Sequence, residues 1–228
     1  MKHRIAVIGG TGPQGKGLAF RFAAAGHAVA IGSRDFERAQ VAADEIASRL
    51  DGAVVSAGTN GDILSDCDMV LLAVPWDGHG ELVRTLAERL AGRVVISCVN
   101  PLGFDKRGPF GLEVAESAAE EAQRLVPAAM VVGAFHHVAA ATLWEDTEPM
   151  GHESVLVCGY NHEAKQTVVE LARAVTGTPG VDAGALRLAR QLEPLTAVLI
   201  SINKRYRTRS GLAITGLPPA TNAAEVST

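Results

Sequence analysis

The sequence has little of what marks secreted, zinc-stabilised or nucleic-acid-binding proteins. It holds three cysteines, Cys67, Cys98 and Cys158, which are odd in number, far apart and set in apolar surroundings. This pattern argues against a disulfide framework and against a structural zinc site, so we expect no metal and free, buried thiols in a reducing compartment. The formal net charge of −4 leaves no broad basic surface, and we expect no nucleic-acid partner.

Long apolar runs are missing as well. No stretch reaches the roughly eighteen consecutive apolar residues that a membrane-spanning helix needs. The apolar stretch 5–8 is too short for a signal-peptide core and leads directly into a glycine-rich turn. We therefore expect a cytoplasmic protein without a membrane partner. Internal repeats and low-complexity segments are also lacking.

The most informative segment is Ile5-Ala-Val-Ile-Gly-Gly-Thr-Gly-Pro-Gln-Gly15. A short apolar strand leads into Gly10-x-Gly12-x-x-Gly15 and then into a helix, which is the phosphate-binding turn of a dinucleotide-binding domain. We expect Gly10 to allow the tight turn, Gly12 to leave room for the pyrophosphate, and Gly15 to bring the helix close to the sheet. The pyrophosphate would face the helix N-terminus. The candidate cofactor contacts here are Gly10, Thr11, Gly12, Pro13, Gln14 and Gly15.

The end of the next predicted strand indicates which dinucleotide is bound. An NAD-binding domain usually carries Asp or Glu at this point for the ribose 2′-hydroxyl, whereas this chain has Ser33 and Arg34. A hydroxyl and a guanidinium suit a 2′-phosphate, so we expect NADP(H). Asp35 could be taken as the acidic ribose ligand, but its place just after Arg34 favours the N-cap of the following helix.

Apolar strands alternate with helical stretches, as in a doubly wound, Rossmann-type parallel sheet. The fold class predicted is therefore α/β, with a small C-terminal α/β lobe. The predicted strands are 4–8, 28–31, 54–57, 69–74, 94–98 and 130–134, and the predicted helices are 14–25, 36–50, 80–90 and 112–125.

The alternation weakens beyond residue 140. We expect a strand at 154–158, a helix at 163–175, an edge piece at 181–182, and an apolar helix at 185–206 that kinks or restarts at Pro194. The apolar helix is expected to pack on the main domain or on a second copy of the chain. The predicted division is 1–140 for dinucleotide binding, 141–217 for a lobe that closes the cleft, and 218–228 for a disordered tail.

Several predicted strands end in residues suited to a ligand site, because ligands bind outside the carboxyl ends of strands in open α/β sheets. Val74, Pro75 and Trp76 are placed to border the nicotinamide, with the indole as a flat wall. The alternative is a strand end followed by a core tryptophan. Asn100 can hydrogen-bond a substrate edge, although Asn-Pro is also an ordinary turn signal.

The sixth predicted strand ends with two adjacent histidines, His136 and His137. Neighbouring strand residues point to opposite faces, so at most one of them would face the cleft if the strand continued. Such a histidine could donate a hydrogen bond to a bound ring or move a proton. A polar strand end satisfied by solvent or backbone is the alternative for each.

These motifs together resemble the NADPH:coenzyme F420 oxidoreductases. The resemblance rests on Gly10-Thr-Gly-x-x-Gly-Lys-Gly-Leu-Ala19, Gly26-His27, Gly32-Ser-Arg34, Val74-Pro-Trp76, the His136 segment and Leu192-Glu-x-Leu-Thr196, and spans residue 5 to about residue 205. The chain departs from the pattern at His137, where a smaller residue is expected, and in the loop 102–111, which is rich in glycine and charge.

The resemblance implies hydride transfer between the nicotinamide C4 of NADP(H) and C5 of the 8-hydroxy-5-deazaflavin coenzyme F420. It implies that Thr11, Ser33, Arg34 and Arg38 hold the 2′-phosphate region, that His136 and Val138 lie near the deazaflavin, and that Leu195 and Thr196 close the pocket. It also implies a homodimer formed through the C-terminal lobe.

Two other functions remain open at this point. One is an NADP-dependent reductase of a small carbonyl or imine substrate, which would usually place Lys, Tyr or Asp in the cleft to protonate the product. The other is a non-catalytic NADPH-binding module, either a sensor or a reductase domain taken from a larger membrane protein. Direct hydride transfer between stacked rings needs no nucleophile, metal or strong acid–base pair, and the sequence displays none with convincing spacing.

Overall fold

A computed structural model describes residues 1–217 of the chain, so the predicted disordered tail, 218–228, lies outside the described residues. The main sheet consists of β1 (Arg4–Ile8), β2 (Ala28–Ser33), β3 (Val55–Thr59), β4 (Met69–Leu72), β5 (Val94–Ser97), β8 (Met130–Gly133), β9 (Leu156–Gly159) and β10 (Val181–Gly184). Their order is β10-β9-β8-β5-β4-β1-β2-β3.

Six neighbouring strands of this sheet run parallel to one another, in the order β8, β5, β4, β1, β2 and β3. This confirms the predicted Rossmann-type sheet. Their near-continuous apolar sequences are typical of strands covered on both faces. β9 runs antiparallel to β8, and β10 runs parallel to β9. The sheet is therefore mostly parallel, with one reversal near its edge.

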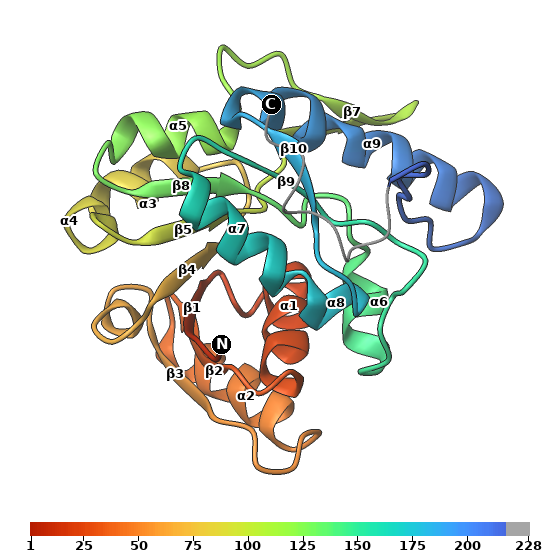
Figure 1. Ribbon diagram of the computed structural model, residues 1–228. Helices are drawn as coiled ribbons and strands as arrows, with labels where there is room; N and C mark the ends of the chain where they lie inside the picture. The colour runs from red at the N-terminus through yellow and green to blue at the C-terminus, as the bar shows by residue number, and fades with distance from the viewer. Residues whose placement is uncertain (218–228) are drawn as a thin grey trace.

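Helices cover both faces of this sheet (Figure 1). One core packs residues of α1 (Pro13–Ala24), α2 (Phe36–Ala47) and α7 (His162–Leu171) against the sheet. The opposite core involves α3 (His79–Thr85), α5 (Ala118–Leu125) and α9 (Ala189–Tyr206). The shorter elements are α4 (Ala87–Leu90), α6 (Ala140–Glu145), α8 (Arg173–Thr176), and the 3₁₀ turns η1 (Asp62–Leu64) and η2 (Leu186–Leu188).

The segment 102–125 differs from its prediction. The expected loop 102–111 forms a hairpin of β6 (Leu102–Asp105) and β7 (Gly108–Gly111), and the helix expected from residue 112 begins at Ala118. It begins there because Ser117 and Glu120 form a capping box, in which each side chain bonds the other residue's backbone N–H. The prediction of the helix start was therefore wrong by about six residues, and α6 was not predicted.

Residues 141–217 contribute β9 and β10 to the main sheet rather than building a separate sheet. The expected restart at Pro194 does not occur, since α9 is one helix with Pro194 inside it. The neighbouring Glu193 is buried and accepts the backbone N–H groups of Ala118 and Ala119, which ties α9 to the start of α5. The division of the chain at residue 140 remains a prediction.

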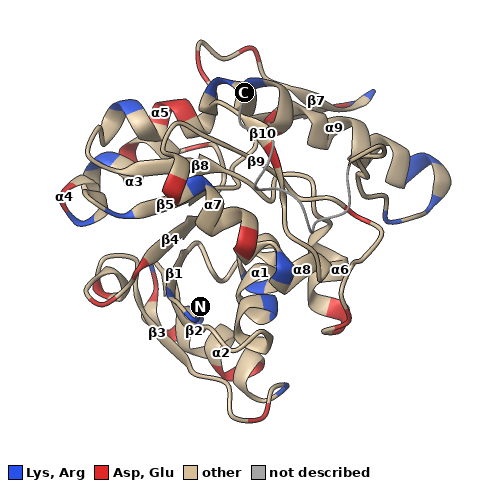
Figure 2. Ribbon diagram, in the orientation of Figure 1, with Lys and Arg blue, Asp and Glu red and all other residues tan. Residues whose placement is uncertain are grey.

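Acidic and basic residues are interspersed over both halves of the molecule (Figure 2). Within residues 1–217, no helix is long and apolar enough to cross a membrane. The three cysteines are free and buried.

Candidate functional site

The turn between β1 and α1 is built by close backbone contacts. Gly9 has φ +77°, a left-handed conformation, and a Cβ there would lie 2.5 Å from the carbonyl oxygen of Ala73. A Cβ at Gly10 would lie 2.9 Å from Ile31 Cγ2 and 3.0 Å from the Val7 carbonyl oxygen, so the tight turn needs glycine at residue 10 as well as at residue 9. The turn is thereby held against the ends of β2 and β4.

Gly15 allows α1 to pack closely on the turn, whereas Gly12 leaves the cleft open. A Cβ at Gly15 would lie 2.6 Å from the Gly9 carbonyl oxygen, so the helix can approach the turn only with glycine there. A Cβ at Gly12 would meet only the Gly9 carbonyl oxygen, at 3.4 Å, and Gly12 lines an open cleft. Pro13 opens α1, where its missing N–H costs nothing. The free N–H groups of this first turn suit a phosphate.

The cleft at the carboxyl ends of β1, β2 and β4 has a volume of about 700 Å³. It brings together seven of the predicted site residues, from the glycine turn, the end of β2, the start of α2 and the residues after β4. These are Thr11, Gly12, Ser33, Arg34, Arg38, Val74 and Pro75. A cavity of this size is ample for the adenosine half of a dinucleotide.

The cationic corner of this cleft is available to an anion. Arg34 and Arg38 are exposed, and neither has an ion-pair partner within the described part of the chain. Asp35 caps α2 by accepting the N–H groups of Glu37 and Arg38, which confirms its interpretation as an N-cap. The Ser33 hydroxyl accepts the N–H of Asp35 at 3.2 Å, so its own proton is free to be donated. The corner therefore suits a phosphate.

Sequence reasoning missed several residues of this cleft. Asn60, just after β3, is nine-tenths buried, and its backbone N–H donates to the Ser33 carbonyl. Asp77, Glu81 and Thr85 line the side formed by α3 and the residues before it. The signal that could have found Asn60 is its position directly after a predicted strand, where ligand-binding side chains gather.

Trp76 lies outside the residues that line the cleft. Its indole is half-buried and stacks on the His79 imidazole, with ring centroids 5.6 Å apart. His79 Nδ1 in turn lies 2.8 Å from Glu121 Oε2. Burial lowers the pKa of His79, and the bond to Glu121 opposes that shift. The indole thus packs on α3 and helps to fix the loop that holds Pro75.

A second group of predicted residues meets where β5 and β8 end. The Asn100 side-chain amide donates to the His136 carbonyl oxygen at 2.9 Å and to Thr196 Oγ1 at 3.1 Å. The Thr196 hydroxyl donates to the same His136 carbonyl at 2.8 Å. Val138 is buried and Leu195 is half-buried. The structure thus joins three predicted residues from distant parts of the chain, Asn100, His136 and Thr196.

The two histidines do not alternate as strand residues. β8 ends at Gly133, and Phe135 has φ +62°, so the extended backbone stops before His136. Both imidazoles are buried; His137 Nε2 lies 2.7 Å from the Ser154 carbonyl oxygen. Burial, with the neighbouring His137, lowers the pKa of His136 to about 3, so this ring is neutral at physiological pH. Within residues 1–217, no group of three His, Cys, Asp or Glu side chains could hold a metal ion.

Gln14 connects the two groups of residues. Its position on the first turn of α1 is next to the cleft, but its amide donates to the Phe135 carbonyl oxygen at 3.1 Å. It is not among the residues that line the cleft.

Comparison with known proteins agrees with this geometry. Residues 4–101 match the family model described as NADP oxidoreductase, coenzyme F420-dependent. The chain is 38% identical to an F420-dependent NADP reductase of Methanothermobacter thermautotrophicus, over 96% of this chain and 97% of that one. It is 34% identical to the F420-dependent NADP reductase of Methanocaldococcus jannaschii, over 94% and 99% of the two chains.

A solved structure from Arthrobacter sp. FB24, provisionally assigned as an F420-dependent NADP-reductase, has a TM-score of 0.79 and 28% identity, covering 94% of this chain and all of that one. The relatives thus match the whole fold, including the residues that follow the dinucleotide-binding strands. The chain belongs to the family of coenzyme F420-dependent NADP oxidoreductases.

Proposed function

We propose that this chain transfers a hydride between NADP(H) and coenzyme F420. The observation that carries the proposal is the cleft in which the glycine turn, Ser33 and the guanidinium groups of Arg34 and Arg38 converge, in a chain whose relatives are named F420-dependent NADP reductases. When NADPH is the donor, it gives a hydride from nicotinamide C4 to C5 of the deazaflavin and one proton is taken up, which yields NADP⁺ and the reduced deazaflavin; the reverse reaction reduces NADP⁺.

The nucleotide end would be held by the residues that line the cleft. The first-turn N–H groups beside Gly12 would bind the diphosphate. Thr11, Ser33, Arg34 and Arg38 would hold the 2′-phosphate through charge-assisted hydrogen bonds, which are stronger than those between neutral groups. Gly10, Pro13 and Gly15 would shape the turn. Val74 and Pro75 would border the nicotinamide, and Trp76, in the same loop, would support them by packing on His79 of α3.

The second ring would lie toward the ends of β5 and β8. Leu195, which is half-buried, offers apolar surface, Val138 belongs to the buried wall behind it, and the network of Asn100 and Thr196 holds the backbone at the His136 carbonyl. Because His136 is neutral and buried, its part would be to shape the wall rather than to act as a strong acid. Holding two rings in contact and excluding water can contribute up to about 7–11 kcal/mol to lowering a barrier.

The test is a direct assay. Purified protein is mixed with NADPH and coenzyme F420, and the visible band of the oxidised deazaflavin is followed; we expect it to disappear, and to do so far more slowly with NADH. NADPH binding without loss of the band would instead favour a non-catalytic NADPH-binding module. Turnover of a small carbonyl or imine in place of the deazaflavin would favour the other reductase.

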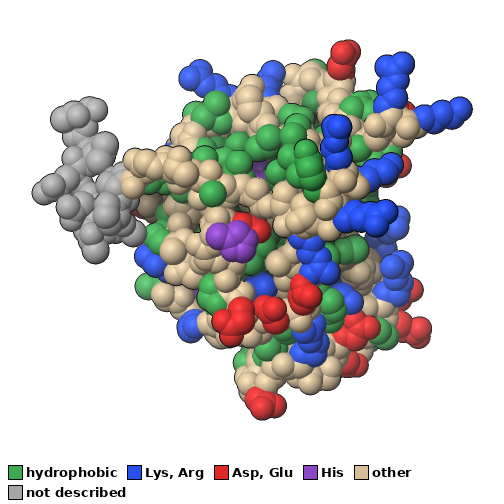
Figure 3. Space-filling model, turned by 90° about the vertical axis from the view of Figure 1, so that its right-hand side faces the viewer, with side chains coloured by type: hydrophobic (Ala, Val, Ile, Leu, Met, Phe, Trp, Pro, Cys, Tyr) green, Lys and Arg blue, Asp and Glu red, His purple; other side chains and the backbone are tan. Residues whose placement is uncertain are grey.

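We also propose that the protein is a cytoplasmic homodimer. Three free thiols support a reducing compartment. Apolar side chains stand exposed on the hairpin and on α9, among them Phe104 at 69%, Val198 at 52% and Tyr206 at 71%. Figure 3 views the side of the molecule where α9 ends and shows hydrophobic side chains gathered in its upper half. Sedimentation of the wild type against Val198→Glu tests this, since a dimer joined through α9 would dissociate in the variant.

A further inference from the structure

The backbone that leaves β8 is held by side chains from three distant elements. The carbonyl of Phe135 accepts a hydrogen bond from Gln14 on α1, and the carbonyl of His136 accepts from Asn100, after β5, and from Thr196, on α9. We refer to these two carbonyls and their three donors as the carbonyl clamp. It joins the glycine turn, through Gln14, to residues proposed for the second ring.

This backbone needs holding because its conformation is unfavourable. Phe135 has φ +62°, a left-handed value that residues with a Cβ rarely adopt, and its side chain is fully buried. The Phe135 ring packs edge-to-face on Phe22, with centroids 5.7 Å apart. Phe22 and Gln14 both belong to α1, so one helix holds both the ring and the carbonyl of Phe135.

Gln14 is also part of the turn that would receive the diphosphate. It is the second residue of α1, directly after Pro13, and the N–H groups of this turn have no partners inside the helix. A diphosphate bound there would order the same turn from which the Gln14 amide reaches Phe135. Gln14 therefore provides a short covalent and hydrogen-bonded path from the nucleotide to residues 136–138.

We propose that Gln14 is a positioning residue that couples occupation of the nucleotide site to the shape of the second-ring wall. The inference rests on the proposed function for its ligands. Gln14 touches neither reacting ring; it acts through the Phe135 carbonyl and so through the His136–Val138 backbone. NADPH should then bind more tightly when the deazaflavin is present, and removing the Gln14 donor should weaken that coupling.

The decisive variant is Gln14→Met, which keeps a side chain of similar length and removes the N–H donor without adding a charge beside the proposed diphosphate. We expect the KM for coenzyme F420 to rise about tenfold, within the usual range of coupling between two sites, with smaller changes in kcat and in the Kd for NADPH. Gln14→Glu, which replaces the donor with an oxygen that repels the Phe135 carbonyl, should raise the KM for coenzyme F420 in the same way and should also weaken NADPH binding, because its negative charge lies beside the proposed diphosphate.

Gln123→Met is the matched control. Gln123, on α5, donates to the Ala129 carbonyl at 2.8 Å and accepts the N–H of Val131 at 3.2 Å, so it holds the opposite end of β8 in the same way. Its replacement should lower stability and leave both KM values within twofold. If Gln14→Met changed the Kd of NADPH as much as the KM of coenzyme F420, Gln14 would be a direct nucleotide contact. If Gln14→Met and Gln123→Met behaved alike, the role of Gln14 would be structural only. Either result overturns the inference.

Hydrogen exchange followed by mass spectrometry separates this inference from the proposed function. In the wild type, NADPH should slow exchange in a peptide covering residues 134–139, and in both Gln14 variants this protection should be lost while NADPH still binds. Protection that persists in the variants contradicts the coupling even if F420 is turned over. Absence of F420 turnover by the wild type contradicts the proposed function but leaves the exchange result interpretable.

Discussion

Asp35 caps the helix that carries Arg38, since its Oδ1 atom accepts the backbone N–H of Arg38 at 3.3 Å. The same atom accepts the N–H of Glu37 at 2.9 Å. The only carboxylate next to Arg34 in sequence is therefore engaged with α2 rather than directed at a ribose. Asp35 lines the cleft beside Arg34 and Arg38, but its carboxylate is engaged in capping α2, so capping and nucleotide binding are two roles that a single substitution can test.

Asp35→Ala should lower the free energy of unfolding by about 1 kcal/mol, because it removes an N-cap. NADPH binding should be unchanged or slightly tighter, since a negative charge near the proposed phosphate site is lost. Urea unfolding and titration with NADPH measure the two effects. A large loss of nucleotide affinity at unchanged stability would mean that Asp35 binds the ribose.

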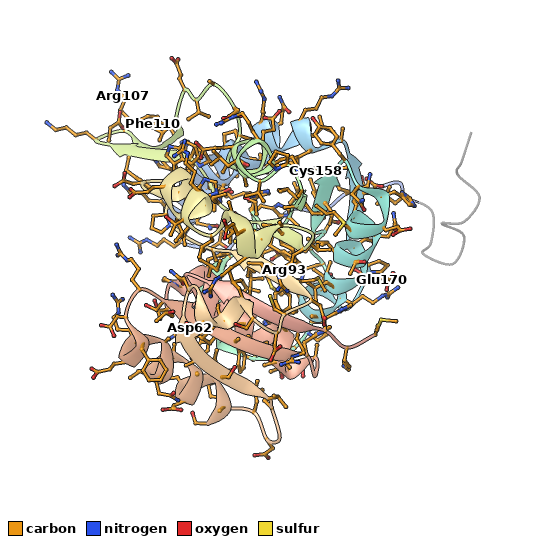
Figure 4. The ribbon with its side chains drawn as sticks, turned by 90° about the vertical axis from the view of Figure 1, so that its left-hand side faces the viewer. Asp62, Arg93, Arg107, Phe110, Cys158 and Glu170 are labelled. Atoms are coloured by element: carbon orange, nitrogen blue, oxygen red, sulfur yellow. The ribbon has the colours of Figure 1, made fainter. Side chains whose placement is uncertain are left out.

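Arg34→Ala should weaken NADPH binding by roughly tenfold to a hundredfold, because a hydrogen bond to a charged group contributes about 1.5–3 kcal/mol. NADH binding should hardly change. Arg107→Ala is the control, since Arg107 is an exposed arginine at the end of the β6–β7 hairpin, far from the glycine turn (Figure 4). Equal losses for NADPH and NADH in Arg34→Ala would count against a 2′-phosphate at this corner.

Gly12→Ala should lower nucleotide affinity, whereas Gly15→Ala should lower the stability of the fold. A methyl at residue 12 has room in the folded chain, so the variant should keep its stability and lose nucleotide affinity. A methyl at residue 15 would lie 2.6 Å from the Gly9 carbonyl oxygen, and overpacking of this kind costs about 1–3 kcal/mol. Thermal unfolding with and without NADPH distinguishes them; unchanged NADPH affinity in Gly12→Ala would argue against a diphosphate on this turn.

Glu193 should make stability depend on pH. Burial raises the pKa of Glu193 from 4.5 to about 7, and the hydrogen bonds from the Ala118 and Ala119 N–H groups oppose this shift. Between these two pH values the folded state therefore holds one more proton than the unfolded state. The free energy of unfolding should therefore fall by about 3 kcal/mol as pH rises from 4.5 to 7, and level off above that.

Urea unfolding of Glu193→Gln at several pH values tests this dependence, because glutamine does not ionise. The difference in stability between wild type and variant should shift in favour of the wild type as the pH is lowered from 7 to 4.5. Glu88→Gln, which removes an exposed carboxylate, should show no such trend. A parallel pH dependence of wild type and Glu193→Gln would exclude this carboxyl as its source.

The turn after β1 and the start of α2 could be predicted from sequence because their determinants are local. The glycine turn follows from backbone sterics and the cap at Asp35 from helix capping, and Ser33 and Arg34 lie beside that cap at the end of β2. The start of α5 could also have been predicted, since Ser117 and Glu120 have the spacing of a capping box. The prediction instead began the helix at residue 112, because apolar residues precede the capping box.

The second-ring side could not be predicted in the same way. The bonds of Gln14 to Phe135 and of Asn100 to Thr196 join residues 121 and 96 positions apart. No periodicity indicates that a side chain will bond a carbonyl on another element. The left-handed backbone of Phe135 could not be predicted either, because that conformation is tolerated only through these tertiary contacts.

The order of the strands has a consequence for how any ligand must lie. The glycine turn follows β1 and the carbonyl clamp follows β8, with β4 and β5 between them. Neighbouring strands are about 4.8 Å apart, so the ends of β1 and β8 are separated by three such steps, roughly 14 Å, and the Gln14 side chain spans part of that distance. A molecule that contacts both the glycine turn and the residues after β8 must therefore lie across the carboxyl ends of β4 and β5.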